Sequence, residues 1–155
     1  MNIGVIVYSK TGHTYSVVNK LSEKLLNSGH SVKIEKLEPI GDVHPGIKSV
    51  EFKNAPDITG YDVVIFGSPV WAFSLSSVFK IYLKSISSLE NKKVICFVTM
   101  AFPFAWMGGK NAISQMNKIC KSKGMAPQLT SVINWTKNKE EKIDKFINNT
   151  IQILK

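Results

Sequence analysis

The chain has 155 residues, a length that predicts one domain over residues 1–155, because two domains would each be small for an independent core. Apolar residues make up 44% of the sequence and aromatic residues 10%, which is enough for a real core and argues against disorder. All 20 basic residues are lysines against 11 acidic residues, so the formal net charge is +9. Because arginine reads guanine edges and none is present, we expect no nucleic-acid partner. The lysine excess either attracts anions or is a compositional bias.

The two cysteines carry no recognisable motif. Cys96 and Cys120 lie in apolar stretches without C-x-x-C or Cys/His spacing, so we expect small buried side chains, no disulfide framework and no metal site. The N-terminus enters a strand-like run without the basic segment of a signal peptide. No apolar run approaches the ~20 residues of a membrane span. These features predict a protein of the reducing cytoplasm, without a membrane span.

Short β-branched runs alternate with amphipathic stretches from the start of the chain. Residues 3–8 are apolar on both faces, as in a central strand that helices cover on both sides. Residues 14–27 have apolar positions at helical spacing, and Gly29 provides a C-terminal cap. Residues 32–35 alternate apolar and charged side chains, which indicates an edge strand. Residues 38–60 contain three prolines and no clean period, so we expect an irregular crossover with at most a short helix.

The same alternation continues through the second half of the chain. Strands are predicted at residues 63–66, 94–98 and 131–133, and helices at residues 75–86, 113–124 and 143–154. Five strand–helix units with continuous apolar strands predict an α/β fold: a doubly wound, five-stranded parallel sheet with helices on both faces. Such sheets bind ligands beyond the carboxyl ends of their strands, so the segments after Tyr8, Phe66 and Val98 should carry the function.

The first of these segments, residues 9–14, leads from a buried strand directly into a helix. A turn that contains Gly12 can point several backbone N–H groups inward, and the helix N-terminus adds partial positive charge. Ser9, Thr11 and Thr14 would add O–H donors, which completes a cradle for a terminal phosphate. Neither G-x4-G-K-S/T nor G-x-G-x-x-G occurs, so this is not a Walker P-loop or a dinucleotide fingerprint. A plain helix cap rich in Ser and Thr is the alternative.

Large aromatic side chains crowd the other two segments. Trp71 and Phe73 follow the third predicted strand, and Phe102, Phe104 and Trp106 follow the fourth. Exposure of a flat apolar side chain to water at this edge costs free energy unless the side chain covers a ligand. The segments therefore predict a site for a large planar ring. The alternative is a small apolar cluster that folds back on the sheet. A phosphate cradle and a planar-ring site at one edge fit flavin mononucleotide (FMN).

Two motifs carry a family resemblance. Residues 8–14, Tyr-Ser-Lys-Thr-Gly-His-Thr, resemble the flavodoxin phosphate loop, whose pattern is Ser/Thr-x-Thr-Gly-x-Thr. Residues 57–71, which end in Gly-Ser-Pro-Val-Trp, resemble the run that enters the second flavin loop of that family. The resemblance covers essentially the whole chain in length and element order. It implies the flavodoxin-like fold with strand order 2-1-3-4-5, the short-chain topology, and non-covalent FMN.

The resemblance also implies which residues hold the cofactor. The phosphate would be wrapped by Ser9, Lys10, Thr11, Gly12, His13 and Thr14. The ring would be flanked by Pro69, Val70, Trp71, Ala72, Phe73, Thr99, Met100, Ala101, Phe102, Trp106, Gly108 and Gly109. Trp71 is the candidate to pack beside the ring. No catalytic side chain is identified, because a flavin carries the chemistry; His13 is a weak candidate, and a solvent-facing loop histidine is its alternative.

The charge distribution departs from that of flavodoxins, which are usually acidic. Residues 91–139 contain lysines but no acidic residue. A positive field would raise the potential of a flavin and attract a nicotinamide phosphate. We therefore expect an FMN-dependent oxidoreductase that passes electrons from NAD(P)H, a co-substrate, to a quinone-like or other small acceptor. The alternatives are a flavodoxin-type electron carrier that serves a partner reductase and acceptor, and a flavin-free signalling or interaction domain. The oligomeric state stays open, a dimer included.

Overall fold

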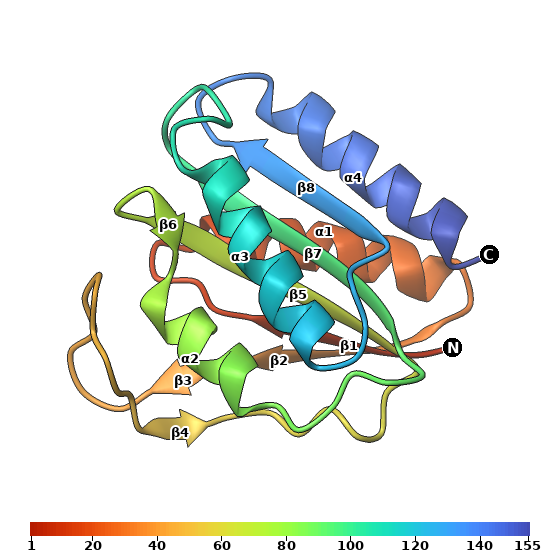
Figure 1. Ribbon diagram of the computed structural model, residues 1–155. Coiled ribbons are helices and arrows are strands. Elements are labelled where there is room, and N and C mark those ends of the chain that lie inside the picture. The colour runs from red at the N-terminus through yellow and green to blue at the C-terminus, as the bar shows by residue number, and fades with distance from the viewer.

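A parallel β-sheet forms the centre of the molecule, and helices cover both of its faces (Figure 1). The computed structural model describes residues 1–155 without a gap. The five parallel strands are β1 (Asn2–Val7), β2 (Ser31–Lys36), β5 (Val63–Trp71), β7 (Lys93–Met100) and β8 (Leu129–Asn134). Their order across the sheet is β2-β1-β5-β7-β8, which confirms the predicted order 2-1-3-4-5.

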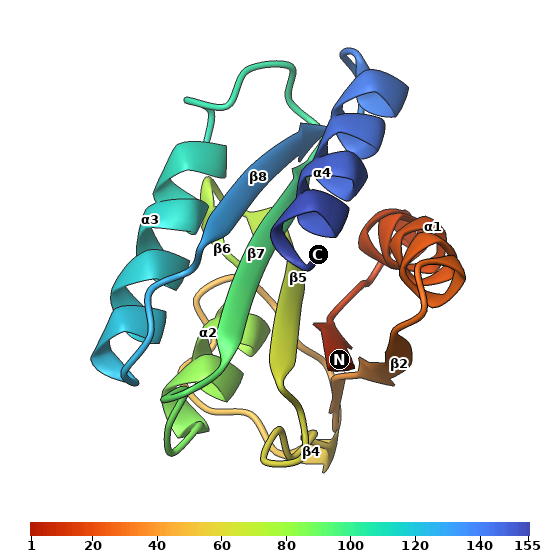
Figure 2. The same cartoon turned by 90° about the vertical axis from the view of Figure 1, so that its right-hand side faces the viewer.

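The four helices are α1 (His13–Asn27), α2 (Ser77–Ser85), α3 (Gly109–Ser122) and α4 (Lys139–Ile153). Helices α1 and α4 pack on one face of the sheet, and α2 and α3 pack on the other (Figure 2). Each predicted helix is present. Helix α1 ends before Gly29, whose φ of +91° is the left-handed conformation expected of a C-terminal glycine cap.

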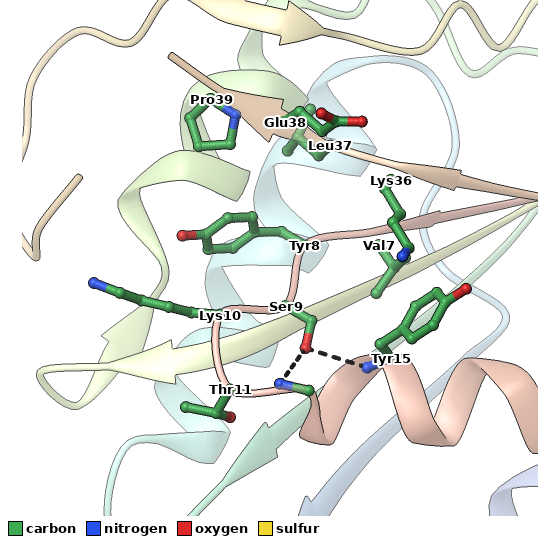
Figure 3. Close-up of a pocket in the computed structure, with 11 residues that line it drawn as sticks. Val7, Tyr8, Ser9, Lys10, Thr11, Tyr15, Lys36, Leu37, Glu38 and Pro39 are labelled. Atoms are coloured by element: carbon green, nitrogen blue, oxygen red, sulfur yellow. Dashed lines mark hydrogen bonds between the residues drawn. The ribbon is translucent and has the colours of Figure 1, made fainter. Parts of the chain in front are cut away.

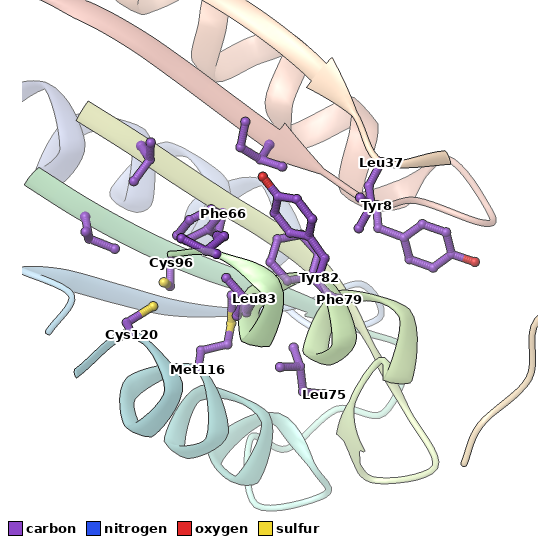
Figure 4. Close-up of a cluster of buried hydrophobic side chains, with 14 of the residues drawn as sticks. Tyr8, Leu37, Phe66, Leu75, Phe79, Tyr82, Leu83, Cys96, Met116 and Cys120 are labelled. Atoms are coloured by element: carbon purple, nitrogen blue, oxygen red, sulfur yellow. The ribbon is translucent and has the colours of Figure 1, made fainter. Parts of the chain in front are cut away.

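Each face of the sheet has its own apolar core, because successive side chains of a strand point to opposite faces. In β1, Val5 faces α1 and α4, whereas Ile6 faces α2 and α3. Phe66 belongs to the core on the α2/α3 side, together with Cys96 and Cys120 (Figure 4). Both cysteines are buried and free, as the sequence predicts, and burial raises the pKa of Cys96.

The crossover at residues 38–60 differs from the sequence expectation. It contains no helix; instead β3 (Glu38–Pro39) and β4 (Phe52–Asn54) pair as a short antiparallel ladder outside the main sheet. Leu37, just before this segment, and Ile58, near its end, are buried in the core next to α2. The segment is therefore fixed by single apolar anchors, which leave no periodic signal in the sequence.

The segment after the third predicted strand also differs from expectation, because β5 continues to Trp71. Residues 67–69 pair with residues 97–99 of β7, which stays extended to Met100 and so prolongs the ladder. Residues 70–71 then turn back through a tight hairpin onto β6 (Ser74–Leu75). Between β5 and β6, only residues 72 and 73 lie outside a strand. No helix of the molecule is both long enough and apolar enough to span a membrane.

Candidate functional site

Three segments meet at the carboxyl ends of β1, β5 and β7, which are neighbours in the sheet. We refer to them as the first loop (residues 8–14), the hairpin (residues 70–75) and the third loop (residues 101–108). In a doubly wound sheet this edge, where the strand order reverses, is the usual ligand site. The contacts described below join the three segments into one surface.

The first loop is folded by the Ser9 side chain. Its hydroxyl oxygen accepts hydrogen bonds from the backbone N–H groups of Gly12 at 3.1 Å and Tyr15 at 3.3 Å (Figure 3). This leaves the Ser9 hydroxyl proton free to donate. Gly12 has a φ of +92°, the left-handed region that favours glycine, so the tight entry into α1 depends on it.

The fold of the first loop leaves a row of free donors. The backbone N–H groups of Lys10, Thr11, His13 and Thr14 donate to no acceptor within the protein. The first turn of α1 contains no acidic residue, so no side chain neutralises the partial positive charge of its N-terminus. These residues fit a bound phosphate, because several free N–H groups at a helix N-terminus are what an anion site uses.

Two side chains of the first loop, those of His13 and Thr14, contact residues of other elements. Thr14 is buried, and its hydroxyl lies 2.8 Å from that of Thr99 at the end of β7. His13 does not face solvent freely: its ring stacks on Trp135, with centroids 4.2 Å apart and an interplanar angle of 12°. The Lys139 ammonium lies 4.7 Å from the centre of the same Trp135 ring. Lys10 and Thr11 are exposed.

The hairpin is joined to the first loop by aromatic contacts. Trp71 meets the Tyr8 ring edge-on at a centroid distance of 5.5 Å, and the Lys10 ammonium lies 5.5 Å from the Trp71 ring. Burial raises the pKa of the Tyr8 phenol, so this ring is neutral at pH 7. Pro69, Val70 and Trp71 are half-buried, whereas Ala72 and Phe73, at the turn, are exposed with φ values of 48° and 61°.

The aromatic residues of the third loop lie at the surface. Phe102 stacks on Phe73 of the hairpin at 5.4 Å, and Phe104 stacks on Trp106 at 5.9 Å. All four are exposed, and none of them belongs to either apolar core of the sheet. Of the other predicted residues, Thr99 and Met100 are buried at the end of β7, and Ala101 is exposed.

The connection between β8 and α4 holds the third loop, and sequence reasoning missed it. The carbonyls of residues 100–102 accept hydrogen bonds, in order, from the Trp135 backbone N–H at 2.8 Å, the Thr136 hydroxyl at 2.7 Å and the Asn134 side-chain amide at 2.9 Å. The available signal was Asn134, a polar residue at the end of an apolar strand, where burial requires a hydrogen-bond partner.

Two glycines set the packing around the start of α3, Gly108 against the hairpin and Gly109 against β8. A Cβ atom on Gly108, where φ is +113°, would lie 2.6 Å from the Phe73 Cα, and one on Gly109 would lie 2.5 Å from a Val132 methyl carbon. The start of α3 therefore sits directly on the hairpin. The Asn111 amide donates to the Phe73 carbonyl, and the Gln115 carbonyl oxygen accepts from the Leu75 backbone N–H.

A cavity of about 560 Å³ borders the first loop on the side of β2. Figure 3 shows Tyr8, Lys10, Tyr15, Lys36 and Pro39 around it. No residue of the hairpin or of the third loop lines this cavity. The predicted site residues are thus brought together by direct contacts between their segments, and the cavity opens beside the first loop alone.

Solved structures share this architecture over the full chain. Flavodoxin 2 from Bacillus cereus is 20% identical with a TM-score of 0.69, covering 97% of this chain and 96% of its own. A flavoprotein from Lactobacillus acidophilus in complex with FMN is 16% identical with a TM-score of 0.64, covering 94% and 97%. Flavodoxin from Fusobacterium nucleatum bound to FMN is 16% identical with a TM-score of 0.63, covering 99% and 96%.

No protein-family model and no curated protein sequence matches the chain. At these identities the structural matches report on the fold. They agree with the strand order β2-β1-β5-β7-β8 and with the helices on both faces of the sheet. By its topology and by its superposition on these structures over nearly its whole length, the chain has the flavodoxin-like fold.

Proposed function

We propose that the protein is an electron-transfer flavoprotein that binds FMN without a covalent bond at the carboxyl edge of its sheet. The observation that carries this is the row of free backbone N–H donors in the first loop, at residues 10, 11, 13 and 14. Support comes from the fold, since solved proteins of the same architecture include complexes with FMN. The location is the one that doubly wound sheets use for phosphate-bearing ligands.

In this proposal the first loop holds the phosphate. The N–H groups of Lys10, Thr11, His13 and Thr14 donate to it, and the Ser9 hydroxyl proton adds a fifth donor. Trp135 fixes the His13 ring by stacking, so the turn into α1 is held before the phosphate arrives. Such preorganised donors do not have to reorient when the anion binds, which favours affinity.

The hairpin and the third loop flank the ring in the same proposal. Trp71 is half-buried and held edge-on by Tyr8, and the third loop is fixed through its backbone carbonyls. FMN, when bound, supplies the electron-transfer chemistry. The contribution of the chain is to bind and orient the cofactor and to cover one side of the ring with apolar surface, which excludes water.

A reductase that uses NAD(P)H is the second candidate. The observation in its favour is the charge: of the residues from Val63 to Lys139, ten are lysines and only Glu90 is acidic. A positive field raises the potential of a bound flavin and attracts a nicotinamide phosphate, and both effects favour reduction by NAD(P)H. The electron carrier takes precedence because the structural neighbours include several flavodoxins.

Turnover measurements separate the two candidates. Purified protein saturated with FMN is mixed with NADH or NADPH and a soluble quinone, and loss of the nicotinamide absorbance is followed. The carrier predicts no oxidation beyond the rate of free FMN until a separate reductase is added. Steady-state oxidation by the protein alone identifies it as the reductase. A protein that is colourless and fails to take up FMN contradicts both.

A further inference from the structure

We propose that an aromatic surface beside the cofactor edge docks an acidic redox protein. The surface, here the aromatic face, consists of Phe73, Phe102, Phe104 and Trp106. This role rests on the proposed function, because it supplies the partner with which an electron-transfer protein exchanges electrons. The partner is defined by its chemistry: a protein with a negatively charged surface around its own redox centre.

The first observation is exposure. The four side chains of the aromatic face are 55%, 47%, 44% and 70% exposed, in the order given above. Single apolar side chains at a protein surface are ordinary, but four large ones from two adjoining segments, stacked in two pairs, are typical of a binding surface. Aromatic side chains are also enriched at the centre of protein interfaces, where they act as anchors.

The second observation is that the aromatic face is held in place. Its rings stack in two pairs, Phe73 on Phe102 and Phe104 on Trp106. The backbone beneath Phe102 is fixed because its carbonyl accepts a hydrogen bond from the Asn134 amide. Surfaces that are ordered before association lose less conformational entropy when they bind.

The third observation is the charge around the face. The Lys137 ammonium lies 4.6 Å from the centre of the Phe104 ring, and Lys110 is exposed in the first turn of α3, where its N–H donates to the Ala105 carbonyl. Glu90, the sole acidic residue between Val63 and Lys139, precedes β7 and therefore lies at the opposite edge of the sheet. Lys110 and Lys137 thus border the aromatic face. The nearest carboxylates along the chain, Glu140 and Glu141, lie in the first turn of α4, where Glu140 pairs with Lys20 and Lys139.

An acidic protein matches these observations better than the other occupants. A second copy of this chain carries the same charge of +9 and is repelled. A further small ligand requires a concave site, and none of the four side chains lines the cavity beside the first loop. Opposite charge at the rim steers association and permits rapid exchange, which suits a transient electron-transfer complex.

Binding to charged probe proteins tests the inference. The probe is an acidic plant-type ferredoxin with a 2Fe–2S cluster, and a basic cytochrome c is the control of opposite charge. Dissociation constants are measured with the full-length FMN-loaded protein at low and at high salt. We expect affinity for the ferredoxin that falls steeply with salt and no measurable affinity for the cytochrome. Equal or stronger binding of the cytochrome overturns the inference.

Matched variants locate the binding surface. Phe104→Ser is compared with Leu26→Ser, because Leu26 is also an exposed apolar residue, and Lys137→Gln is compared with Lys24→Gln. Leu26 and Lys24 lie near the end of α1, at the edge of the sheet opposite the aromatic face. Phe104→Ser should weaken ferredoxin binding about tenfold and Lys137→Gln about threefold, with both controls unchanged. Equal losses in the controls contradict the inference.

Two further measurements distinguish a failure of the docking inference from a failure of the proposed function. FMN affinity is measured in every variant. Lys137→Gln, which lies outside the three segments proposed to hold FMN, should retain it, and ferredoxin binding by Phe104→Ser is compared at saturating FMN because Phe104 belongs to the third loop. A wild-type chain that binds ferredoxin but not FMN contradicts the proposed function while the docking surface stands. Vesicles of phosphatidylserine test a lipid surface: binding that is stronger to vesicles than to ferredoxin, and lost in Phe104→Ser, assigns the aromatic face to a membrane and overturns the inference.

Discussion

The hydroxyls of Thr14 and Thr99 lie 2.8 Å apart in a buried hydrogen bond that connects the start of α1 to the end of β7. The two residues are 85 positions apart in the chain, and both are less than 5% exposed. The bond fixes the first loop relative to the third loop from behind. It therefore sets the distance between the segments proposed to hold the phosphate and the ring.

Removal of both hydroxyls should cost less stability than the two single removals added together. Thr14→Val or Thr99→Val leaves a buried hydroxyl without a partner, which costs about 1–2 kcal/mol of unfolding free energy. The double variant Thr14→Val/Thr99→Val removes both hydroxyls and should lie closer to the wild type than the sum of the single variants. Urea unfolding checks this, with exposed Thr11→Val as a control; strictly additive losses contradict the coupling.

A side chain at Gly12 should affect FMN binding, whereas one at Gly29 should not. Both glycines flank α1 with nearly equal φ values, +92° and +91°, and a Cβ at either meets no atom within 4 Å. Gly12→Ala and Gly29→Ala should therefore each lose about 1–2 kcal/mol of stability from backbone strain alone. Only Gly12→Ala should also weaken FMN binding, by tenfold or so, because it distorts the donor row. Similar FMN affinities in the two variants would place the phosphate elsewhere.

Gly108 should tolerate a methyl group poorly because two segments meet there. Gly108→Ala brings its Cβ against the Phe73 backbone and must displace the hairpin, whereas Gly41→Ala, with φ of +80°, enters open space. We expect a loss of unfolding free energy for Gly108→Ala larger than the ~1–2 kcal/mol of strain in Gly41→Ala, together with weaker FMN binding. Thermal unfolding and FMN titration of both variants check this. Equal stability of the two variants would mean that the contact is not retained in solution.

The stability of the protein should fall above pH 10. The Tyr61 hydroxyl donates to the Glu35 carboxylate at 2.7 Å and the Tyr82 hydroxyl to the Pro56 carbonyl at 2.7 Å, and burial raises the pKa of both phenols. In the unfolded chain both phenols ionise at about pH 10, whereas in the folded chain they ionise at higher pH. Above pH 10 the unfolded state therefore binds fewer protons than the folded state, and the free energy of unfolding declines as pH rises. Tyr61→Phe should flatten this slope in urea unfolding between pH 9 and 11, relative to Tyr15→Phe as control. An unchanged slope contradicts the account.

Much of the fold could be predicted from the sequence because buried parallel strands and amphipathic helices leave periodic patterns. Residues 3–8 and 94–98 are apolar on both faces, which is a direct consequence of helices on both sides of the sheet. The crossover at residues 38–60 was not predictable in this way. Its short ladder is held by backbone pairing and by single anchors such as Leu37, which do not repeat at any period.

For the candidate site, the sequence indicated the segments but not how they are held. Gly12 and the hydroxyls around it are local signals, and they mark the first loop. The contacts of Trp135 with His13, and of the Asn134 amide with the third loop, join residues more than 30 positions apart, and no local pattern encodes them. Likewise the continuation of β5 to Trp71 depends on its neighbour β7, so a stretch that contains Pro69 was expected to be a loop.

Titration of the purified chain with FMN tests the central claim most directly. Flavin fluorescence is quenched on binding beside aromatic rings, so the signal reports both the affinity and the surroundings of the ring. The account predicts saturable binding at one FMN per chain with micromolar or lower Kd, and loss of affinity on Gly12→Ala but not on Gly29→Ala. Absence of saturable binding, or affinity that is equal in the two variants, would contradict the assignment of the first loop as a phosphate site.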